Sequence, residues 1–225
     1  MIKVHYSGSA GNLYQVENML IDPGVSIKKI KEALGFKLSC ISGCFCGHGH
    51  RDHCLAAKDL MKCGVDVYCS KDTAQSAGLS GHRLHIIEAK KQFTIEKYKI
   101  KPFDLVHDVS NLGVVISFDG LKVMYAVDTN YIPYRFTGLT HIILGVSYDA
   151  KKLERNTYNF ELNLEVAKRI LKSHLSIQTA VKCFQANDMS SVEEIHLVHL
   201  SDKNSDAEGF KTAVEKVTGR PVFVH

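Results

Sequence analysis

The chain has 225 residues, of which 45% are hydrophobic and 23% are charged, with a formal net charge of +4. These values are typical of a folded globular protein and exclude a disordered or low-complexity chain. No apolar run approaches the roughly 18 residues that a membrane-spanning helix needs, and residues 1–6 show no secretion signal. We therefore expect no membrane association. Because no internal repeat or long linker is present, we expect a single domain over residues 1–225.

Cysteine and histidine are the informative residue types. Seven cysteines, an odd number without the spacing of a disulfide framework, favour a reducing, cytoplasmic setting. Twelve histidines are unusually many and need an explanation. The mild positive charge permits an anionic substrate but does not identify one.

The first half of the chain predicts short strands and helices in alternation. A turn is expected at Ser7–Asn12, and Asp22-Pro23-Gly24 ends the second strand. Expected strands cover 2–6, 13–21, 65–70, 84–88, 93–95 and 98–103, and expected helices cover 27–34, the segment after His53, and 72–77.

The second half begins with a predicted hairpin, because Asp119-Gly120 separates two β-type runs. Strand and helix then alternate, which together with the early strands predicts an α/β (α+β) fold of mixed sheets with helices outside. Expected strands cover 112–118, 122–127, 142–147, 194–199 and 221–224, and expected helices cover 163–171, 177–186 and 206–217.

The densest group of candidate ligands is the pattern His48-x-His50-x-Asp52-His53. It lies between an apolar segment, 40–45, and a helix-like one, 55–63, and a tight turn there would let the side chains converge. Imidazole and carboxylate are ligands that zinc and manganese accept. The spacing favours a metal site over the alternative, a solvated polar turn.

Three further candidates follow predicted strands, where loops place reactive groups on a rigid scaffold. They are His107, Asp128 and His199. Each alone could be an ordinary cap or turn residue. Together with the four residues of the first pattern they make seven ligands, enough for two metal ions that share one carboxylate.

In these motifs and their order, the chain resembles the metallo-β-lactamase-fold hydrolases over nearly its whole length. Asp22 in the segment 20–24 matches the first motif, and His48–His53 matches the signature. A narrower likeness is to the small branch typified by the YycJ/WalJ proteins, which is associated with 5′-to-3′ exonuclease activity on DNA and has relatives in phages. The segments that carry it are 7–12, 107–113, Ser173-His174-Leu175-Ser176 and 199–204.

The resemblance implies a four-layer αββα sandwich, with two mixed sheets face to face and two metal ions at one edge. It also implies roles at the matching positions. Asp22 would accept a hydrogen bond from a ligand imidazole, and His174 would contact the scissile phosphate or protonate the leaving oxygen. Asp52, Asp128 and His174 are therefore the expected catalytic residues. One metal would be held by His48, His50 and His107, the other by Asp52, His53 and His199, with Asp128 between them.

Several alternatives stay open at this point. Asp22 could be only a turn former, and Ser176 could explain the Ser-His-Leu-Ser motif as a helix N-cap. Cys46-Gly47 replaces the usual approach to the signature, so we expect a looser backbone and an altered metal affinity with all ligands retained. The lysine groups, Lys151-Lys152 among them, indicate solvated faces that could in part line a nucleic-acid track. Four cysteines could form a structural zinc site, but their spacing favours buried side chains that pack like small hydrophobic residues. They are Cys40, Cys44, Cys46 and Cys54.

The leading hypothesis is a hydrolase in which two divalent ions, zinc or manganese, activate a water molecule for attack on a phosphodiester, with DNA as substrate and exonuclease activity. A second hypothesis keeps the chemistry but takes a small ester, cyclic nucleotide, lactone or thioester, because the fold does not choose among substrates. A third is a metal-binding module without turnover. The sequence does not indicate the oligomeric state.

Overall fold

The computed structural model describes residues 2–225. Its contacts divide the chain into two compact units, each described here by itself. Unit 1 runs to Asp104 and includes Val109–Gly113, and unit 2 consists of Leu105–Asp108 and Val114–His225. The strands form two mixed sheets, in the orders β1-β2-β3-β4-β5-β6 and β13-β12-β11-β10-β9-β8-β7. The predicted class, mixed sheets with helices, is confirmed, whereas the single domain over 1–225 stays a prediction.

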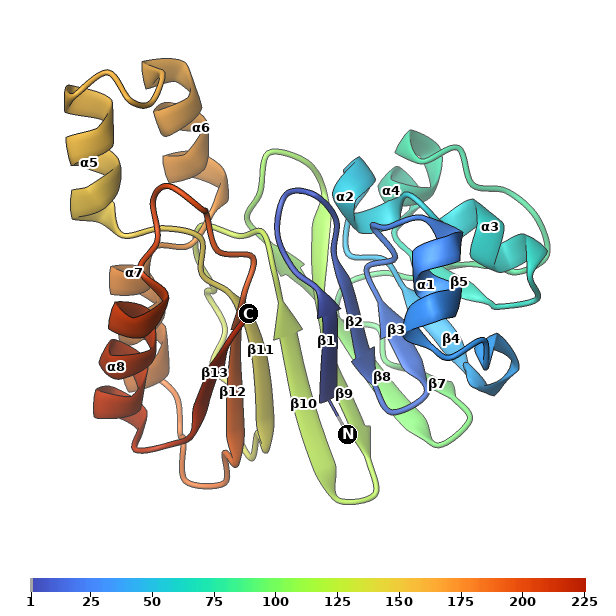
Figure 1. Ribbon diagram of the computed structural model, residues 1–225. Helices are drawn as coiled ribbons and strands as arrows, with labels where there is room; N and C mark the ends of the chain where they lie inside the picture. The colour runs from blue at the N-terminus through green and yellow to red at the C-terminus, as the bar shows by residue number, and fades with distance from the viewer. Residues whose placement is uncertain (1) are drawn as a thin grey trace. The chain divides into compact units, whose positions relative to one another are not determined.

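The sheet of six strands belongs to unit 1 (Figure 1). Its first three strands are antiparallel and the others are parallel. The prediction of one strand over 13–21 is wrong, because Val16 pairs with Met19 across a tight turn in which Glu17 has a φ of 49°. The strands are β1 (Ile2–Tyr6), β2 (Leu13–Val16), β3 (Met19–Ile21), β4 (Gly43–Phe45), β5 (Val67–Cys69) and β6 (Leu84–Ile86).

Short helices cover this sheet. Ile30 of α1 and Leu60 of α3 are fully buried in one cluster with Leu20, Cys44 and Val67 of the strands. Burial of such side chains contributes about 1.5–3 kcal/mol each. The hydroxyls of two serines cap α1 and α4 by accepting a backbone N–H, which marks where each helix begins. The helices are α1 (Ile27–Ala33), the 3-10 turn η1 (Leu38–Cys40), α2 (Arg51–Cys54), α3 (Ala57–Lys62) and α4 (Lys71–Ser76). The strands that follow them, β7 (Phe93–Ile95) and β8 (Tyr98–Leu105), belong to the seven-stranded sheet.

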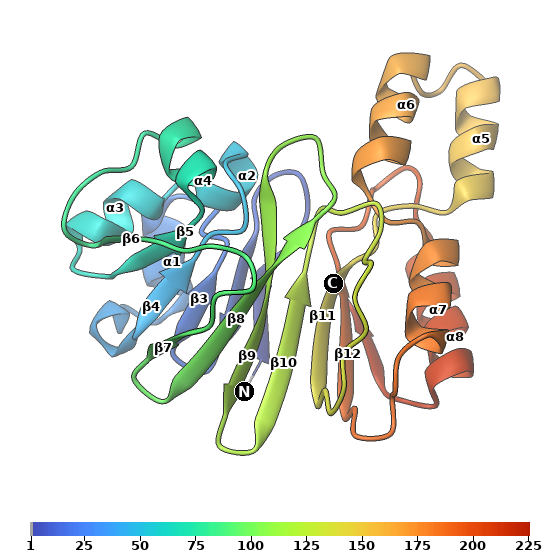
Figure 2. The ribbon, with the colours of Figure 1, turned by 180° about the vertical axis from the view of Figure 1, so that it is seen from behind.

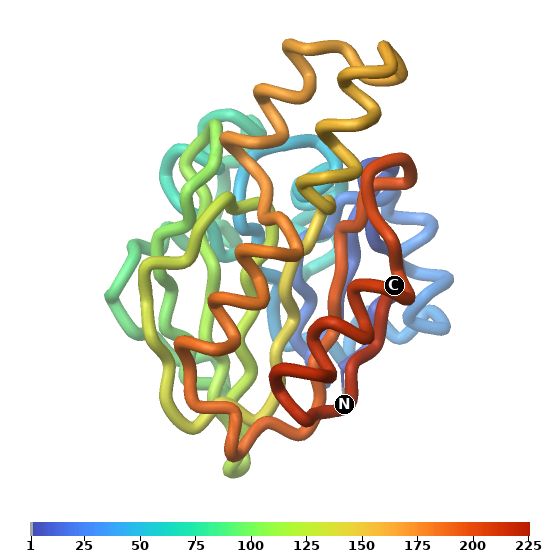
Figure 3. The backbone as a smooth tube through the Cα atoms, turned by 90° about the vertical axis from the view of Figure 1, so that its left-hand side faces the viewer, coloured from blue at the N-terminus to red at the C-terminus, as the bar shows by residue number. Residues whose placement is uncertain are grey.

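Unit 2 contains the predicted hairpin, where Asp119 and Gly120 have φ values of 47° and 80° between paired strands. The later strands are added in parallel, and α7 and α8 cover one face of them (Figure 3). Parallel strands align their carboxyl ends, so the loops that follow them lie together. The elements are β9 (Asn111–Phe118), β10 (Leu121–Ala126), β11 (His141–Gly145), α7 (Ile177–Gln185), β12 (Glu194–Val198), α8 (Ala207–Thr218) and β13 (Val222–Val224).

A helical hairpin projects from unit 2. It consists of α5 (Ala150–Tyr158) and α6 (Leu164–Ser173), which stand clear of the strands of this unit (Figure 2). Helix α6 falls where a helix is predicted, but α5 is not predicted by the sequence. Its buried residues are only Leu153 and Asn156, so an apolar stripe that would reveal the helix is missing. In the loop between α5 and α6, Phe160 is 96% exposed.

The cysteines are exposed to different degrees. Cys44, Cys46 and Cys54 are buried and free, as predicted. For Cys40 the prediction is wrong, because this residue is exposed at the end of η1. Among residues 2–225, no helix has the length and apolar character that crossing a lipid bilayer requires.

Candidate metal-binding site

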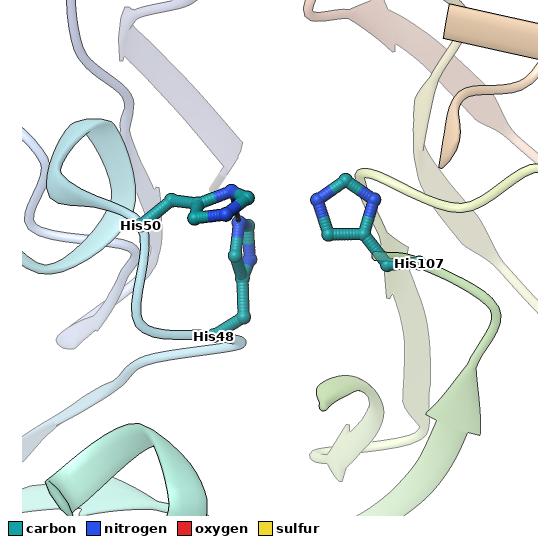
Figure 4. Close-up of side chains that lie close together, drawn as sticks. All are labelled: His48, His50 and His107. Atoms are coloured by element: carbon teal, nitrogen blue, oxygen red, sulfur yellow. Dashed lines mark hydrogen bonds between the residues drawn. The ribbon is translucent and has the colours of Figure 1, made fainter. Parts of the chain in front are cut away.

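The signature histidines of unit 1 lie on the loop that leaves β4 and on the short helix α2. Nε2 of His48 and Nδ1 of His50 are 3.1 Å apart, and their rings meet edge-on at 4.7 Å and 78° (Figure 4). The ring of His53 lies 4.2 Å from that of His48. His48 and His53 are 1% and 0% exposed, so this segment is not a solvated polar turn. Three imidazoles therefore converge within unit 1, next to Asp52.

Asp22 supports this group from the end of β3. One carboxylate oxygen, Oδ2, lies 2.6 Å from Nδ1 of His53, and the other accepts the N–H of Gly47 at 2.7 Å. An ionised carboxylate can only accept hydrogen bonds, so it keeps the proton of His53 on Nδ1. The lone pair is then on Nε2, where a ligand imidazole needs it. The contact between Asp22 and an imidazole is thus present, and the role of that imidazole as a metal ligand stays a prediction.

An Asp22→Asn variant tests that contact. We expect metal affinity to fall about 10–100-fold, because asparagine has one acceptor oxygen in place of the two with which Asp22 contacts Gly47 and His53. Competition with a chromophoric chelator measures the affinity. Asp104→Asn, at an exposed position of the same unit, is the control and should bind metal as the unmodified protein does. Equal affinities in the two variants would show that Asp22 does not govern the imidazole.

Asn12 is a site residue that the sequence identified only as part of a turn. Its Nδ2 lies 3.0 Å from the carbonyl oxygen of Asp52 and 3.1 Å from Nε2 of His53. Its Oδ1 accepts the N–H of Gly8 and the hydroxyl of Tyr14. The side chain is fully buried. The turn at Ser7–Asn12 is therefore structural and also holds the start of α2 in place.

Gly24 and Gly47 permit close packing around the signature. A Cβ on Gly24 would lie 1.6 Å from the carbonyl oxygen of Asp52, and one on Gly47 would lie 3.0 Å from Oδ1 of Asn111. The N–H of Gly47 donates to Asp22, and its carbonyl accepts the N–H of Leu112 at 3.1 Å. The expectation of a looser backbone at Gly47 is therefore wrong, because both its backbone polar groups are hydrogen-bonded.

A second group of candidate ligands lies in unit 2. Oδ1 of Asp128 is 3.6 Å from Nε2 of His199 and 3.5 Å from Nε2 of His174. The ligand atoms of these three residues all lie within 4.8 Å of one another. The rings of His107 and His174 are 5.5 Å apart, so His107, on the segment after β8, belongs to the same neighbourhood. This unit thus brings together all four of its predicted site residues.

Three predicted site residues share an uncommon backbone conformation. Asp22, Asp128 and His199 follow β3, β10 and β12 with φ values of 50°, 55° and 58°. The left-handed region is rare for non-glycine residues, although Asp, Asn and His are enriched there. It turns the chain sharply after each strand. Such conformations cluster at functional sites, where the surrounding structure maintains them.

Ser173 orients two imidazoles of unit 2. Its carbonyl oxygen lies 2.8 Å from Nδ1 of His107 and accepts that N–H. Its hydroxyl donates to the carbonyl of Arg169, so it accepts from Nδ1 of His174 at 2.8 Å. The neutral His174 imidazole then carries its lone pair on Nε2, whereas Nε2 of His107 lies 3.0 Å from Oδ1 of Asp108.

His174 is neutral at neutral pH. Burial lowers the pKa of its imidazole to about 4; the charge of Asp128 opposes this shift, and His199 and His107 add to it. The alternative explanation of the Ser-His-Leu-Ser motif holds for Ser176, which caps α7 by accepting the N–H of Thr179 at 3.1 Å. That cap does not involve the His174 side chain, and a catalytic role of His174 stays a prediction.

The residues of both units fit a divalent metal by their chemistry. Each unit presents imidazole nitrogens and carboxylate oxygens, the ligands of zinc, manganese or iron. Nδ1 of His53 donates to the carboxylate of Asp22, and Nδ1 of His107 donates to the carbonyl of Ser173. Metal-ligating histidines commonly make such a hydrogen bond with the nitrogen that does not bind the metal.

Comparison with known families and structures agrees with this geometry. The family model described as "Beta-lactamase superfamily domain" matches residues 17–200. The chain belongs to the β-lactamase superfamily. No curated protein matches this superfamily member.

Solved structures similar to the superfamily member share its fold at low sequence identity. YhfI from Bacillus subtilis, a metallo-β-lactamase fold protein, has 14% identity and a TM-score of 0.75, with 100% of this chain and 95% of that chain covered. Igni18 from Ignicoccus hospitalis, a metallo hydrolase, has 16% identity and a TM-score of 0.71, with 100% and 94% covered. Human tRNase Z, short form, has 13% identity and a TM-score of 0.60, with 89% and 93% covered. The predicted metallo-β-lactamase fold is confirmed, and the narrower likeness to the YycJ/WalJ branch stays a prediction.

Proposed function

We propose that this β-lactamase superfamily member is a metal-dependent hydrolase of phosphodiesters, with DNA as the leading substrate and exonuclease action as the leading mode. The observation that supports the proposal is that each unit contains a cluster of imidazole and carboxylate side chains. Both clusters lie at strand ends and in loops. Their chain order is that of the family motifs. Igni18 is described as a metallo hydrolase and human tRNase Z as a tRNase, so the fold supports both hydrolysis and work on nucleic acid.

The proposed ligands are those that the motifs assign. His48, His50 and His107 would hold one divalent ion, Asp52, His53 and His199 the other, and Asp128 would be shared; zinc or manganese suits these ligands. When bound, such ions supply Lewis acidity and lower the pKa of a coordinated water. The chain's own contribution is orientation, because Asp22 and the carbonyl of Ser173 hold Nδ1 of His53 and of His107.

His174 would move a proton in a defined direction. Its Nδ1–H is directed to Ser173, and its Nε2 is unprotonated at neutral pH. Nε2 therefore begins as a proton acceptor. It could protonate a leaving oxygen only after taking up a proton, which makes it a shuttle rather than an acid poised at the start of the reaction.

A substrate panel tests the proposed function. The purified protein, supplied with Mn²⁺ or Zn²⁺, is incubated with end-labelled single-stranded and duplex DNA, bis(p-nitrophenyl) phosphate, a cyclic nucleotide, a lactone and a thioester. We expect cleavage of the DNA and of the phosphodiester, and a DNA affinity that falls steeply with salt because counterions are released. Turnover of only the lactone or thioester would replace the proposal with a small-ester hydrolase. Tight metal binding without any turnover would replace it with a metal-binding module.

A further inference from the structure

Unit 2 has a second concave surface, on the helices rather than at the strand ends. A groove with a volume of about 930 Å³ lies between the start of α5, α7 and the start of α8. In Figure 3 the orange α7 and the red α8 lie side by side, and the gold α5 lies above them. This surface, termed the basic groove here, has Ile177, Val181 and Phe210 among its apolar lining residues.

Four cations line the basic groove, from two of its helices: Lys151, Lys152, Arg155 and Lys182. Nζ of Lys152 donates to the carbonyl of Ser205 at 2.6 Å, which fixes that charge at the edge of the groove. Within residues 2–225, no ion pair neutralises the other three, and their side chains are exposed. Cations that face water without a partner are available to an incoming anion.

The two carboxylates in the lining are already hydrogen-bonded. Both oxygens of Asp149 accept, from the N–H of Lys152 at 2.8 Å and from Nε2 of Gln178 at 2.6 Å. Asp206 accepts the N–H of Gly209 at 3.1 Å as the cap of α8. These contacts hold the carboxylates at helix N-termini, where the helix dipole favours negative charge. With four cations and two carboxylates in its lining, the groove has a formal charge of +2.

Two loops connect the site residues of unit 2 with the groove along the chain. Ile177 in its lining is three residues after His174, so their Cα atoms are at most about 11 Å apart. The N–H of Ser147 donates to Leu175, and the N–H of Ser201 donates to Ser147, both at 2.9 Å. The loop that begins with His199 also ends in the groove, at Ser205 and Asp206.

We infer that the basic groove binds the sugar–phosphate backbone of a single-stranded nucleic acid whose scissile bond lies at the proposed metal site. The inference rests on the proposed phosphodiesterase function and extends it with a substrate-holding surface. Single-strand binders use a positively charged groove that follows the sugar–phosphate backbone. The four cations of the basic groove provide such a track. Its phosphate contacts position the strand without reading its sequence.

Fluorescence anisotropy with a labelled, phosphorothioate-linked oligothymidylate of about twelve nucleotides tests the inference on the full chain. The test variant carries Lys151→Glu, Arg155→Glu and Lys182→Glu. The control carries Lys37→Glu, Lys58→Glu and Lys216→Glu, the same change of net charge at exposed positions outside the groove. We expect the test variant to bind at least about tenfold more weakly and the control to bind nearly normally. The slope of log K against log salt should fall by about 2, because each lost phosphate contact contributes about 0.7.

Equal binding by the two variants, or an unmodified protein that does not bind the oligonucleotide, would overturn the inference. Equal groove-dependent binding of polyglutamate would also overturn it and indicate an acidic peptide as the occupant. Lys182→Glu alone serves if the triple variant does not fold, as judged by thermal unfolding. Hydrolysis of bis(p-nitrophenyl) phosphate by the unmodified protein tests the proposed function separately, since that diester is too short to reach the groove.

Discussion

An Asp128→Asn variant is expected to hydrolyse phosphodiesters about a thousandfold more slowly while keeping its fold. The side-chain oxygen of Asp128 lies 3.6 Å from Nε2 of His199, a proposed metal ligand, and 3.5 Å from Nε2 of His174. The asparagine amide lacks the negative charge of Asp128. A loss of several kcal/mol of metal-dependent transition-state stabilisation corresponds to a rate loss of this size. Metal content, measured by elemental analysis, should fall in parallel with the rate.

Asp119→Asn is the matched control for this substitution. Asp119 has a similar backbone conformation, with a φ of 47° against 55° for Asp128, but lies in the hairpin turn between β9 and β10. Asparagine tolerates the left-handed region, so both variants should unfold at nearly the temperature of the unmodified protein. Full activity of Asp128→Asn would contradict the proposed mechanism, whereas a loss shared with Asp119→Asn would trace the effect to the backbone.

The second large effect is expected from Gly24→Ala, a change of one methyl group. The new Cβ would lie 1.6 Å from the carbonyl oxygen of Asp52 and 2.7 Å from the backbone nitrogen of His53. These are backbone atoms, so a rotamer change cannot relieve the clash. We expect the free energy of unfolding to fall by about 3 kcal/mol or more, because overpacking commonly costs 1–3 kcal/mol and this contact is severe.

Urea denaturation measures this difference against Gly138→Ala. Gly138 has a φ of 63° with nothing within 4 Å of its Cβ, so that variant reports backbone strain alone, about 1–2 kcal/mol. A Gly24→Ala variant no less stable than Gly138→Ala would show that the loop before α1 and the start of α2 can separate at little cost.

The sequence predicts which side chains gather in each unit, because metal chemistry would restrict residue types at fixed spacing, and their role as metal ligands stays a prediction. The His48–His53 pattern and the later motifs place every candidate ligand in one of the two groups that the units contain. What the sequence does not reveal depends on packing between distant segments. Asn12 contacts α2 across some 40 residues, and the close approach of Gly24 to Asp52 leaves no local signal.

The errors in the fold have similar causes. The turn at Glu17 interrupts a continuous β-type run without glycine or proline, so the pattern predicts one strand where two form. Helix α5 is missed because it buries only two residues, one of them Asn156. The polar surface that hides α5 from the pattern also supplies two of the exposed cations of the basic groove.

Ser173 gives the projecting hairpin of α5 and α6 a mechanical connection to chemistry. The last residue of α6 holds His107 through its carbonyl and His174 through its hydroxyl. Because both hydrogen bonds end on the same residue, a displacement of Ser173 would change the orientations of both imidazoles together, as one coordinate rather than as two independent ones.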